Sequence, residues 1–507
     1  MSLQLPGSIP FLVALLAGVA HAAAAASPWN GRPQWWLQLL ALGVLVALLH
    51  RERRPLRGFA IGASFATAWL TATWWWWFIS LHTYGGLAAP LTVLAVVGLA
   101  AFLGLYYAAA VGVYSAVAAS SGRWAFVFFA ALWAFGELLR VWAFTGFPWG
   151  AAGYAHLDGP LAGYAPWIGV HGMSFLAALV AAGLAGALRH RLGAALAVAV
   201  LGLGLALPLF GPFTTSNGRV SVTLLQGNIP QNEKFQPGSG IPLALDWYGR
   251  QLEEATTALV VAPETAIPLL PRQLPEGYLE AISKRYVSGS QAALVGIPLG
   301  SLSDGYSNSV IGIRPGAAMY RYDKHHLVPF GEFIPPLFRW FTEMMNIPLG
   351  DFRRGAVGQP SFDWSGQRFA PNICYEDLFG EELGQRFSDP ASAPTVFVNV
   401  SNIGWFGNTI AIDQHLHISR LRTLEFERPM LRATNTGATV IIDHRGQVTR
   451  SLVRGTRGVL TGEVEGRNGT TPYAWWVSRV GLWPYWMLFG AIIAFALGRR
   501  RGAGARR

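Results

Sequence analysis

The stretch Pro371-Asn372-Ile373-Cys374-Tyr375-Glu376-Asp377 carries the only cysteine among the 507 residues of this chain. The cysteine is the last residue of a segment, residues 368–374, whose pattern predicts a buried strand. A thiol beside carboxylates is suited to nucleophilic catalysis, whereas a free cysteine without such a role usually packs as a small apolar side chain. With a single cysteine no intramolecular disulfide forms, so the surrounding domain is held by its core alone.

Other segments of the same character lie on both sides of this stretch, separated by Gly, Pro and Asn. Between several of them lie helical patterns, at 247–256, 276–286 and 412–427. Such alternation predicts an α/β domain whose sheets are covered by helices. The remaining predicted strands are 220–226, 258–262, 292–296, 309–313, 395–400 and 439–443.

The rest of the chain has the composition of a membrane protein. Hydrophobic residues make up 52% of the sequence and charged residues 13%, and there are 21 Trp. Stretches of about 20 apolar residues, long enough for a hydrocarbon layer of roughly 30 Å, recur along it. They lie near 8–26, 34–50, 58–80, 88–118, 124–144, 161–188, 192–210 and 480–498.

We therefore expect three segments: seven transmembrane helices in 1–210, an extracytoplasmic α/β domain in 211–479, and an eighth helix with an Arg-rich tail in 480–507. The net charge of +11 lies on short loops and on the tail, while 211–498 carries 24 basic and 24 acidic residues. A nucleic-acid-binding face would concentrate that charge, so we expect no nucleic acid partner. Arginines between helices two and three, four and five, and six and seven place both termini in the cytoplasm.

Two reactive side chains follow predicted strands elsewhere in the α/β domain. Glu264 lies in Val261-Ala262-Pro263-Glu264-Thr265, and Lys324 begins a stretch that runs to Glu332. Strand-end Glu and Lys side chains are more often solvated or salt-bridged than catalytic. Together with Cys374, however, they supply a carboxylate, an ammonium and a thiol, which are the groups that acyl transfer needs.

Glu264, Lys324 and Cys374, in this order, resemble the Glu-Lys-Cys triad of the nitrilase, or carbon-nitrogen hydrolase, superfamily, which has an α-β-β-α sandwich fold. A domain of this kind preceded by seven spans and followed by one resembles the bacterial apolipoprotein N-acyltransferase family. Three further stretches are similar to motifs of that family: Gln226-Gly227-Asn228-Ile229-Pro230-Gln231, Lys324 to Glu332, and Thr145-Gly146-Phe147-Pro148-Trp149.

The resemblance implies an inner-membrane enzyme without a cofactor that works by a ping-pong scheme. Cys374 attacks a phospholipid ester and carries the acyl chain as a thioester, and the N-terminal amine of a diacylglyceryl apolipoprotein then accepts that chain. Glu264 acts as the base. Lys324 and the backbone N–H after the cysteine stabilise the oxyanion. We expect the protein to be a monomer.

The resemblance also assigns accessory residues. Glu332 is expected to orient Lys324 or to assist proton transfer, and Tyr375 and Glu376 to position the substrate. Phe235 stands where the family often carries Trp, so the aromatic ring is kept but not an indole N–H. Asn399 and Asn402 follow a predicted strand, where they either line the pocket or make loop hydrogen bonds.

Several residues are candidates for contact with lipid. The apolar segment 335–355 is expected to be a membrane-facing flap, with Trp340, Phe341, Met344 and Met345 toward the acyl chain. Glu137 and Arg140, three residues apart on one helix, either pair with each other or meet a lipid headgroup. The run 74–77, four consecutive Trp, is expected in an aromatic belt.

Two other functions compete with acyl transfer. A membrane-tethered amidase or nitrilase would let water resolve the thioester, but it has no need for eight spans or for the segment 335–355. An inactive membrane scaffold or transporter has no need for the intact triad. The pairs His325-His326 and His415-x-His417 lack a completing carboxylate or thiol cluster, so we expect no metal site.

Overall fold

The computed structural model describes residues 7–50, 52–188, 190–301, 303–334 and 352–504. The chain forms two compact units. The first unit comprises Met1–Phe78, Ala88–Gly211 and Val480–Arg507, and the second comprises Ile79–Leu87 and Pro212–Arg479. The short segment Ile79–Leu87 thus belongs to the second unit although helices of the first unit flank it in the sequence.

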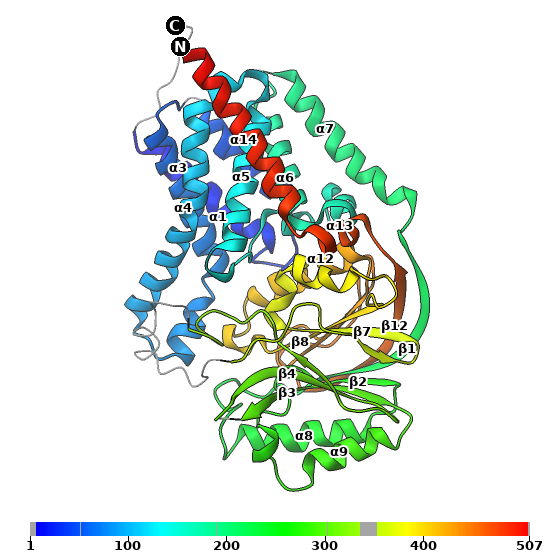
Figure 1. Cartoon of the computed structure of the whole chain (residues 1–507). Coiled ribbons are helices and arrows are strands. Elements are labelled where there is room, and N and C mark those ends of the chain that lie inside the picture. Colours follow the sequence, from blue (N-terminus) through cyan, green and yellow to red (C-terminus); the bar gives the residue numbers. More distant parts are fainter. Residues whose placement is uncertain (1–6, 51, 189, 302, 335–351, 505–507) are drawn as a thin grey trace. The chain divides into compact units, whose positions relative to one another are not determined.

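The first unit is helical, and each predicted apolar segment contains one helix (Figure 1). Its apolar side chains form these helices because a chain in a hydrocarbon layer must satisfy its backbone hydrogen bonds internally. The helices are α1 Ile9–Ala25, α2 Trp35–Leu49, α3 Pro55–Trp74, α4 Ala89–Ser121, α5 Ala125–Trp142, α6 Ala165–Ala185, α7 Arg191–Ala206 and α14 Trp483–Gly504.

Eight membrane crossings are not confirmed. Among the described residues, four helices are long and apolar enough to span: Ala89–Ala118, Gly122–Thr145, Pro160–Ala185 and Arg191–Phe210. A fifth span is added if Pro472–Val480 and Trp483–Arg500 count as one. The apolar helices α1 and α2 are shorter, at 17 and 15 residues.

Glu137 and Arg140 do not form the expected pair with each other. Their side chains are only 1% and 0% exposed, so neither lies on the surface of the first unit. Glu137 accepts hydrogen bonds from Ala152 N at 3.1 Å and pairs with His171 Nδ1 at 2.8 Å. Arg140 instead donates to backbone carbonyl oxygens of the loop that follows α5, and within the described residues no ion pair joins the two. Each side chain has partners on a nearer loop or helix, so the expected mutual pair is not formed, while contact of these residues with a lipid headgroup stays a prediction.

The tryptophan run is also mostly internal. Trp74 and Trp76 are 1% and 0% exposed, and only Trp75 of the four is classed as exposed. Trp74 Nε1 donates to Trp149 O at 3.2 Å, and the rings of Trp76 and Trp149 lie 5.0 Å apart. The expected aromatic belt is therefore wrong for Trp74 and Trp76, which pack against the loop after α5.

The second unit contains two six-stranded sheets, each with parallel and antiparallel pairs. One sheet has the order β12-β1-β2-β3-β4-β5 and the other β11-β10-β9-β8-β7-β6. The first sheet comprises β1 Thr214–Gln226, β2 Leu259–Val261, β3 Ala292–Ser301, β4 Gly305–Ile313, β5 Tyr320–Asp323 and β12 Gly458–Gly469. The second comprises β6 Phe362–Trp364, β7 Gln367–Ile373, β8 Val396–Ser401, β9 Met430–Thr434, β10 Val440–Ile442 and β11 Val448–Ser451.

The two sheets pack face to face, with helices on their outer sides (Figure 1). One apolar core joins residues of both sheets, such as Leu224, Val261, Phe369 and Val398. A second core joins the first sheet to α8 Gly240–Glu254 and α9 Tyr278–Val287. Helices α11 Gly380–Gly384 and α12 Ala411–Phe426 follow strands β7 and β8 of the second sheet, and α13 Pro472–Val480 follows β12 of the first sheet.

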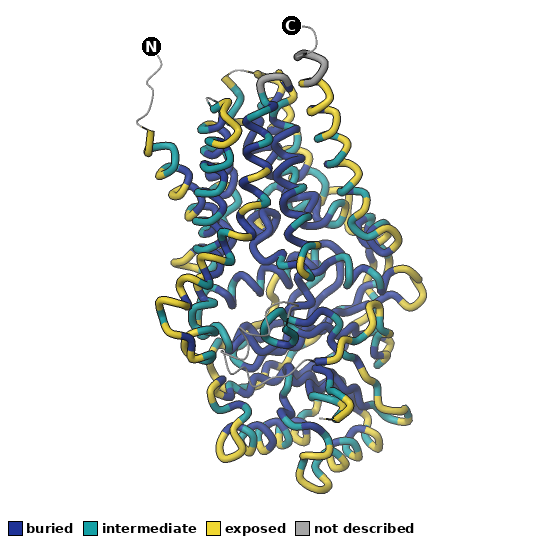
Figure 2. Tube along the Cα trace, turned by 60° about the vertical axis from the view of Figure 1, so that its left-hand side comes forward, coloured by how far each residue is buried: buried dark blue, intermediate teal, exposed yellow. Residues whose placement is uncertain are grey.

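The burial of residues within this unit follows the layers. Buried residues occupy most positions of the central strands, whereas all four residues of β11 are exposed. Exposed residues gather at the outer edge of the trace (Figure 2). The seven predicted strands and three predicted helices are all present. Strands β5, β6, β9, β11 and β12 were not predicted, because they are short or carry charged side chains; β12, for example, alternates buried residues with exposed Glu463.

Candidate active site

Each of the three predicted catalytic residues follows a strand of the sandwich. Glu264 lies three residues after the end of β2, Lys324 directly follows β5, and Cys374 directly follows β7. Strands β2 and β5 belong to one sheet and β7 to the other. The site is therefore assembled where strand ends of both sheets meet.

Lys324 is held between two carboxylates. Its ammonium Nζ lies 2.8 Å from Glu332 Oε1 and 3.4 Å from Glu264 Oε1. Asn308, on β4, joins the same carboxylates, since its Nδ2 donates to Glu264 Oε1 at 2.7 Å and to Glu332 Oε1 at 2.9 Å. Sequence analysis missed Asn308 because nothing in a strand pattern distinguishes an amide that bridges two distant acids.

Burial makes this arrangement strongly electrostatic. Lys324 is 1% exposed, and charges in such a site interact through a low dielectric. Burial alone would lower the pKa of Lys324, but the adjacent Glu332 and Glu264 carboxylates raise that pKa above its usual value. Lys324 is therefore a fixed cation at neutral pH.

Cys374 sits at a strained backbone position. Its φ angle is +52°, in the left-handed region that side chains other than Gly rarely adopt. Such strain is kept only where surrounding contacts over-determine it, and it occurs often at active sites. The conformation turns the chain sharply from β7 into the 3₁₀ turn Cys374–Leu378.

The thiol is protonated in the resting site. Burial and the negative charge of Glu264 raise the pKa of the Cys374 thiol to about 12, while Lys324 acts in the opposite direction. A thiol with that pKa attacks an ester only if a base removes its proton during the reaction. The neighbouring Glu264 carboxylate is suited to do so.

Glu376 braces the two loops rather than facing a free surface. Its carboxylate accepts hydrogen bonds from Ile373 N at 2.6 Å, from His325 N at 2.6 Å and from Tyr322 Oη at 2.7 Å. It thereby ties the residue before Cys374 to the residue after Lys324. Tyr375 is also buried, with its ring 5.3 Å from that of Phe379. The positioning of substrate by Tyr375 and Glu376 stays a prediction.

A second lysine lies beside the site and was not predicted. Lys234 is 2% exposed and its Nζ donates to the backbone oxygen of Glu264 at 3.0 Å. Burial lowers the pKa of Lys234 to about 8, although the nearby Glu264 acts in the opposite direction. Phe235 is half-buried, with its ring 5.8 Å from the Lys234 ammonium. The signal available in the sequence was only that Lys234 lies three residues beyond the stretch 226–231.

Glu264 is also anchored by the backbone of a loop that follows the other sheet. Asn402 N, in the loop after β8, donates to Glu264 Oε2 at 2.8 Å. The Asn402 side chain donates to Gln231 Oε1 at 2.8 Å. Asn402 therefore serves loop hydrogen bonding and base positioning together.

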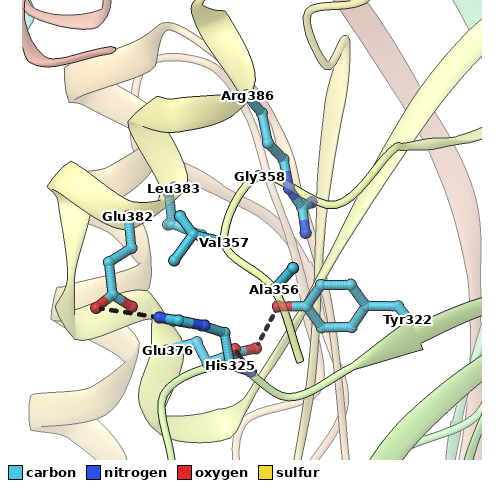
Figure 3. Close-up of a pocket in the computed structure, with 9 residues that line it drawn as sticks. All are labelled: Tyr322, His325, Ala356, Val357, Gly358, Glu376, Glu382, Leu383 and Arg386. Atoms are coloured by element: carbon cyan, nitrogen blue, oxygen red, sulfur yellow. Dashed lines mark hydrogen bonds and ion pairs between the residues drawn. The ribbon is translucent and has the colours of Figure 1, made fainter. Parts of the chain in front are cut away.

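A small pocket lies next to this site but does not contain the triad. It is lined by Tyr322, His325, Glu376, Glu382 and Arg386, among others (Figure 3). Burial raises the pKa of Glu382 to about 7. Glu264, Lys324 and Cys374 do not line it.

Two other groups of sequence candidates remain. Within the ranges that the structure describes, no cluster of three or more His, Cys, Asp or Glu is arranged to hold a metal ion. The candidates for lipid contact in 335–351 lie outside the described residues. These are Trp340, Phe341, Met344 and Met345.

The sandwich with a cysteine, a lysine and a glutamate at its strand ends defines a carbon-nitrogen hydrolase domain, and residues 221–473 match the family model of that description. Residues 17–183 match the model described as the apolipoprotein N-acyltransferase N-terminal domain. The chain belongs to the apolipoprotein N-acyltransferase family.

Relatives cover almost the whole chain. An apolipoprotein N-acyltransferase from Verminephrobacter eiseniae is 58% identical over 496 residues, which are 92% of this chain and 92% of the relative. One from Ralstonia nicotianae is 44% identical over 97% of this chain and 94% of the relative. Among solved structures, a carbon-nitrogen hydrolase from Helicobacter pylori G27 is similar at 14% identity, with a TM-score of 0.36, over 54% of this chain and 95% of its own.

Proposed function

We propose that this protein transfers an acyl chain from a phospholipid to the N-terminal cysteine amine of diacylglyceryl apolipoproteins, through a thioester on Cys374. The observation that carries the proposal is the buried Lys324 ammonium, 2.8 Å from Glu332 and 3.4 Å from Glu264, in a site shared with a protonated thiol. Membership of the apolipoprotein N-acyltransferase family supports the choice of substrates.

In the first half-reaction the Cys374 Sγ attacks the ester carbonyl carbon of the phospholipid. Glu264 takes the thiol proton, which matters because that thiol has a raised pKa. The carbonyl oxygen becomes an oxyanion, stabilised by the Lys324 cation and by the backbone N–H after the cysteine. The C–O ester bond then breaks, Glu264 returns the proton to the leaving alkoxide, and a lysophospholipid departs.

In the second half-reaction the α-amine of the acceptor attacks the thioester carbon. Glu264 removes a proton from the nitrogen as the new C–N bond forms, and the C–S bond breaks. The proton goes to the departing sulfur, so an amide is formed and the Cys374 thiol is restored. The same carboxylate therefore serves both halves of a ping-pong scheme.

Glu332 and Asn308 hold the charges in place during both halves. Glu332 Oε2 also accepts a hydrogen bond from Val328 N at 2.9 Å, which fixes this carboxylate to its own loop. Asn308 keeps the two carboxylates at a set spacing around Lys324. A preorganised cation of this kind costs no reorganisation when the oxyanion forms.

For the membrane we propose eight spans, seven in 1–210 and one in 480–507, with both termini cytoplasmic. The domain 211–479 then lies on the periplasmic side of a bacterial inner membrane, where it works as a monomer. The described apolar helices and the placement of arginine in the loops support this arrangement.

The test is mass spectrometry of Cys374 after incubation with defined phospholipids, with and without a diacylated acceptor peptide. We expect a hydroxylamine-sensitive acyl adduct on Cys374 that is lost on addition of the peptide, which becomes N-acylated. Cys374→Ser should form no such adduct. Rapid release of free fatty acid without acceptor would favour the amidase or nitrilase alternative, and no adduct at all would favour the scaffold.

A further inference from the structure

Two buried side chains from other elements form hydrogen bonds with the backbone carbonyl oxygen of Cys374. His415 Nε2, on α12, lies 3.2 Å from Cys374 O, and Asn399 Nδ2, on β8, donates to the same oxygen at 3.2 Å. Both side chains are 0% exposed. They act at the residue whose backbone has the unfavourable φ of +52°, so they help to hold that conformation.

The tautomer of His415 follows from its other neighbour. Arg432 Nη2 lies 2.8 Å from His415 Nδ1, and a guanidinium can only donate. Nδ1 therefore accepts, and the ring proton is on Nε2. That N–H points at Cys374 O and at Asp377 Oδ1, which is 2.9 Å away. The His415 ring is thus a neutral donor through Nε2, and Arg432 fixes its orientation through Nδ1.

The arginine is itself fixed on several sides. Arg432 Nη1 donates to Asn399 Oδ1 at 3.1 Å and lies 3.3 Å from Asp377 Oδ2. Ser419 Oγ donates to the same carboxylate at 2.5 Å. Arg432, Asp377 and Ser419 are all 0% exposed. Asn399 is therefore held by the same arginine as His415, and the two donors to Cys374 O form one network.

Fixing this carbonyl also fixes the amide that follows it. The peptide unit between Cys374 and Tyr375 is planar and, like every peptide bond described, not cis. In a trans unit the C=O and N–H point in opposite directions. Two hydrogen bonds to Cys374 O therefore set the direction of Tyr375 N–H, on the side away from the network.

We propose that His415 and Asn399, held by Arg432 and Asp377, are positioning residues that aim the Cys374–Tyr375 peptide so that its N–H meets the oxyanion formed on Cys374. This inference rests on the proposed function, because the oxyanion arises only in acyl transfer. The network does not touch the ammonium of Lys324 through any hydrogen bond found among the described residues, so it acts on the oxyanion independently of that cation.

The experiment compares two reactions of the same sulfur. Acylation by a phospholipid passes through an oxyanion, whereas alkylation by iodoacetamide displaces iodide and forms none. Because Cys374 is the only cysteine, alkylation reports on this thiol alone. We expect His415→Ala to lower the single-turnover acylation rate about 10²-fold, on the scale of losing one oxyanion donor, and to change alkylation less than about threefold.

Two further variants complete the test. His415→Gln restores a side-chain N–H donor and should recover at least about tenfold of the lost acylation rate. Asn399→Ala should show the same selective loss as His415→Ala, and it decides the question if His415→Ala does not fold. The matched control is His417→Ala, which removes a buried histidine from α12 two residues along and hence on another face.

Three outcomes would overturn the inference. If His415→Ala and Asn399→Ala acylate at the rate of the unaltered protein, which itself forms the adduct, the proposed function stands and the positioning role fails. If acylation and alkylation fall in parallel in both variants, the network is merely structural. If the unaltered protein forms no acyl adduct, the proposed function fails first and the inference fails with it.

Discussion

Lys324 Nζ lies 2.8 Å from Oε1 of Glu332, a residue eight positions further along the chain. This is the shorter of the two ion pairs of Lys324, and both partners are nearly fully buried. Glu332 is therefore the stronger ion-pair partner of the Lys324 ammonium. Glu264, the more distant partner of Lys324, is the proposed base.

Glu332→Gln should slow thioester formation by about 10²-fold, the lower end of the range for a positioned acid–base group. Glutamine keeps the size and the acceptor oxygen but removes the charge, so the Lys324 ammonium loses its nearer counter-ion. The rate is measured by mass spectrometry of the Cys374 adduct in a single turnover with phospholipid.

The control for Glu332 is Glu382→Gln. Glu382 is another partly buried glutamate, bonded to His326 Nδ1 at 2.8 Å in the pocket beside the site. The Glu382→Gln variant should form the Cys374 adduct at the rate of the unaltered protein. Equal rates for Glu332→Gln and Glu382→Gln would refute the assignment of Glu332.

Glu264→Gln should lower both the acylation rate and the thiol pKa of Cys374. Acylation at neutral pH should fall by about 10²- to 10⁴-fold, because the general base is lost. The pKa of the thiol should also fall, because the Glu264 charge is one of the causes that raise it to about 12. The pH at which iodoacetamide alkylation reaches half its maximum rate should therefore move down.

A protease-resistance measurement distinguishes loss of the proposed base in Glu264→Gln from misfolding of that variant. A variant that misfolds exposes the thiol and lowers its pKa toward that of a free cysteine, but it also loses the protection of the domain from protease. We expect Glu264→Gln to resist protease as the unaltered protein does. Unchanged acylation in this variant would remove Glu264 from the mechanism.

Two of the three proposed catalytic residues follow strands that local sequence features predict. Glu264 and Cys374 come after the predicted strands β2 and β7, whereas β5, which precedes Lys324, was not predicted from its pattern. The order of the three residues matched a known family, which is information beyond physical pattern. In the structure these three strands belong to two sheets, and the catalytic roles of the residues that follow them stay a prediction.

The supporting residues were not predictable because they act through tertiary contacts. Strand β9 was missed since Arg432 interrupts its apolar pattern, and that arginine is tolerated only because Asp377, from another element, compensates its charge. For Glu137 and Arg140 the sequence predicted a contact that the structure does not contain. Their spacing on one helix face predicted a pair, yet each found a partner on another element or a following loop, which sequence spacing does not reveal.

The proposed topology makes a simple prediction about access. A protease added outside spheroplasts should cut within 211–479 and spare the Arg-rich tail 499–507, because positively charged loops and tails stay in the cytoplasm. Immunoblots against tags at the C-terminus and within 211–479 would measure this. Cleavage of the tail with protection of 211–479 would contradict the topology.

Lys234 should make the stability of the protein depend on pH in a defined direction. Its pKa is about 8 in the folded protein, below the ordinary value of 10.5, so between these values the unfolded chain holds a proton that the folded chain lacks. The free energy of unfolding contributed by Lys234 therefore rises with pH from about 8 to about 10.5 and is smallest below pH 8.

Lys234→Met removes this titration while keeping an unbranched side chain in the buried site. The free energy of unfolding of the unaltered protein, measured relative to Lys234→Met by denaturant titration in one detergent, should rise by roughly 3 kcal/mol over that interval. All other titrating groups are shared by the two proteins and cancel in the comparison. Lys284→Met, at a lysine in the last turn of α9, is the control and should show no such rise. A difference in the free energy of unfolding that stays flat or falls across this pH range would show that burial does not lower the pKa of Lys234.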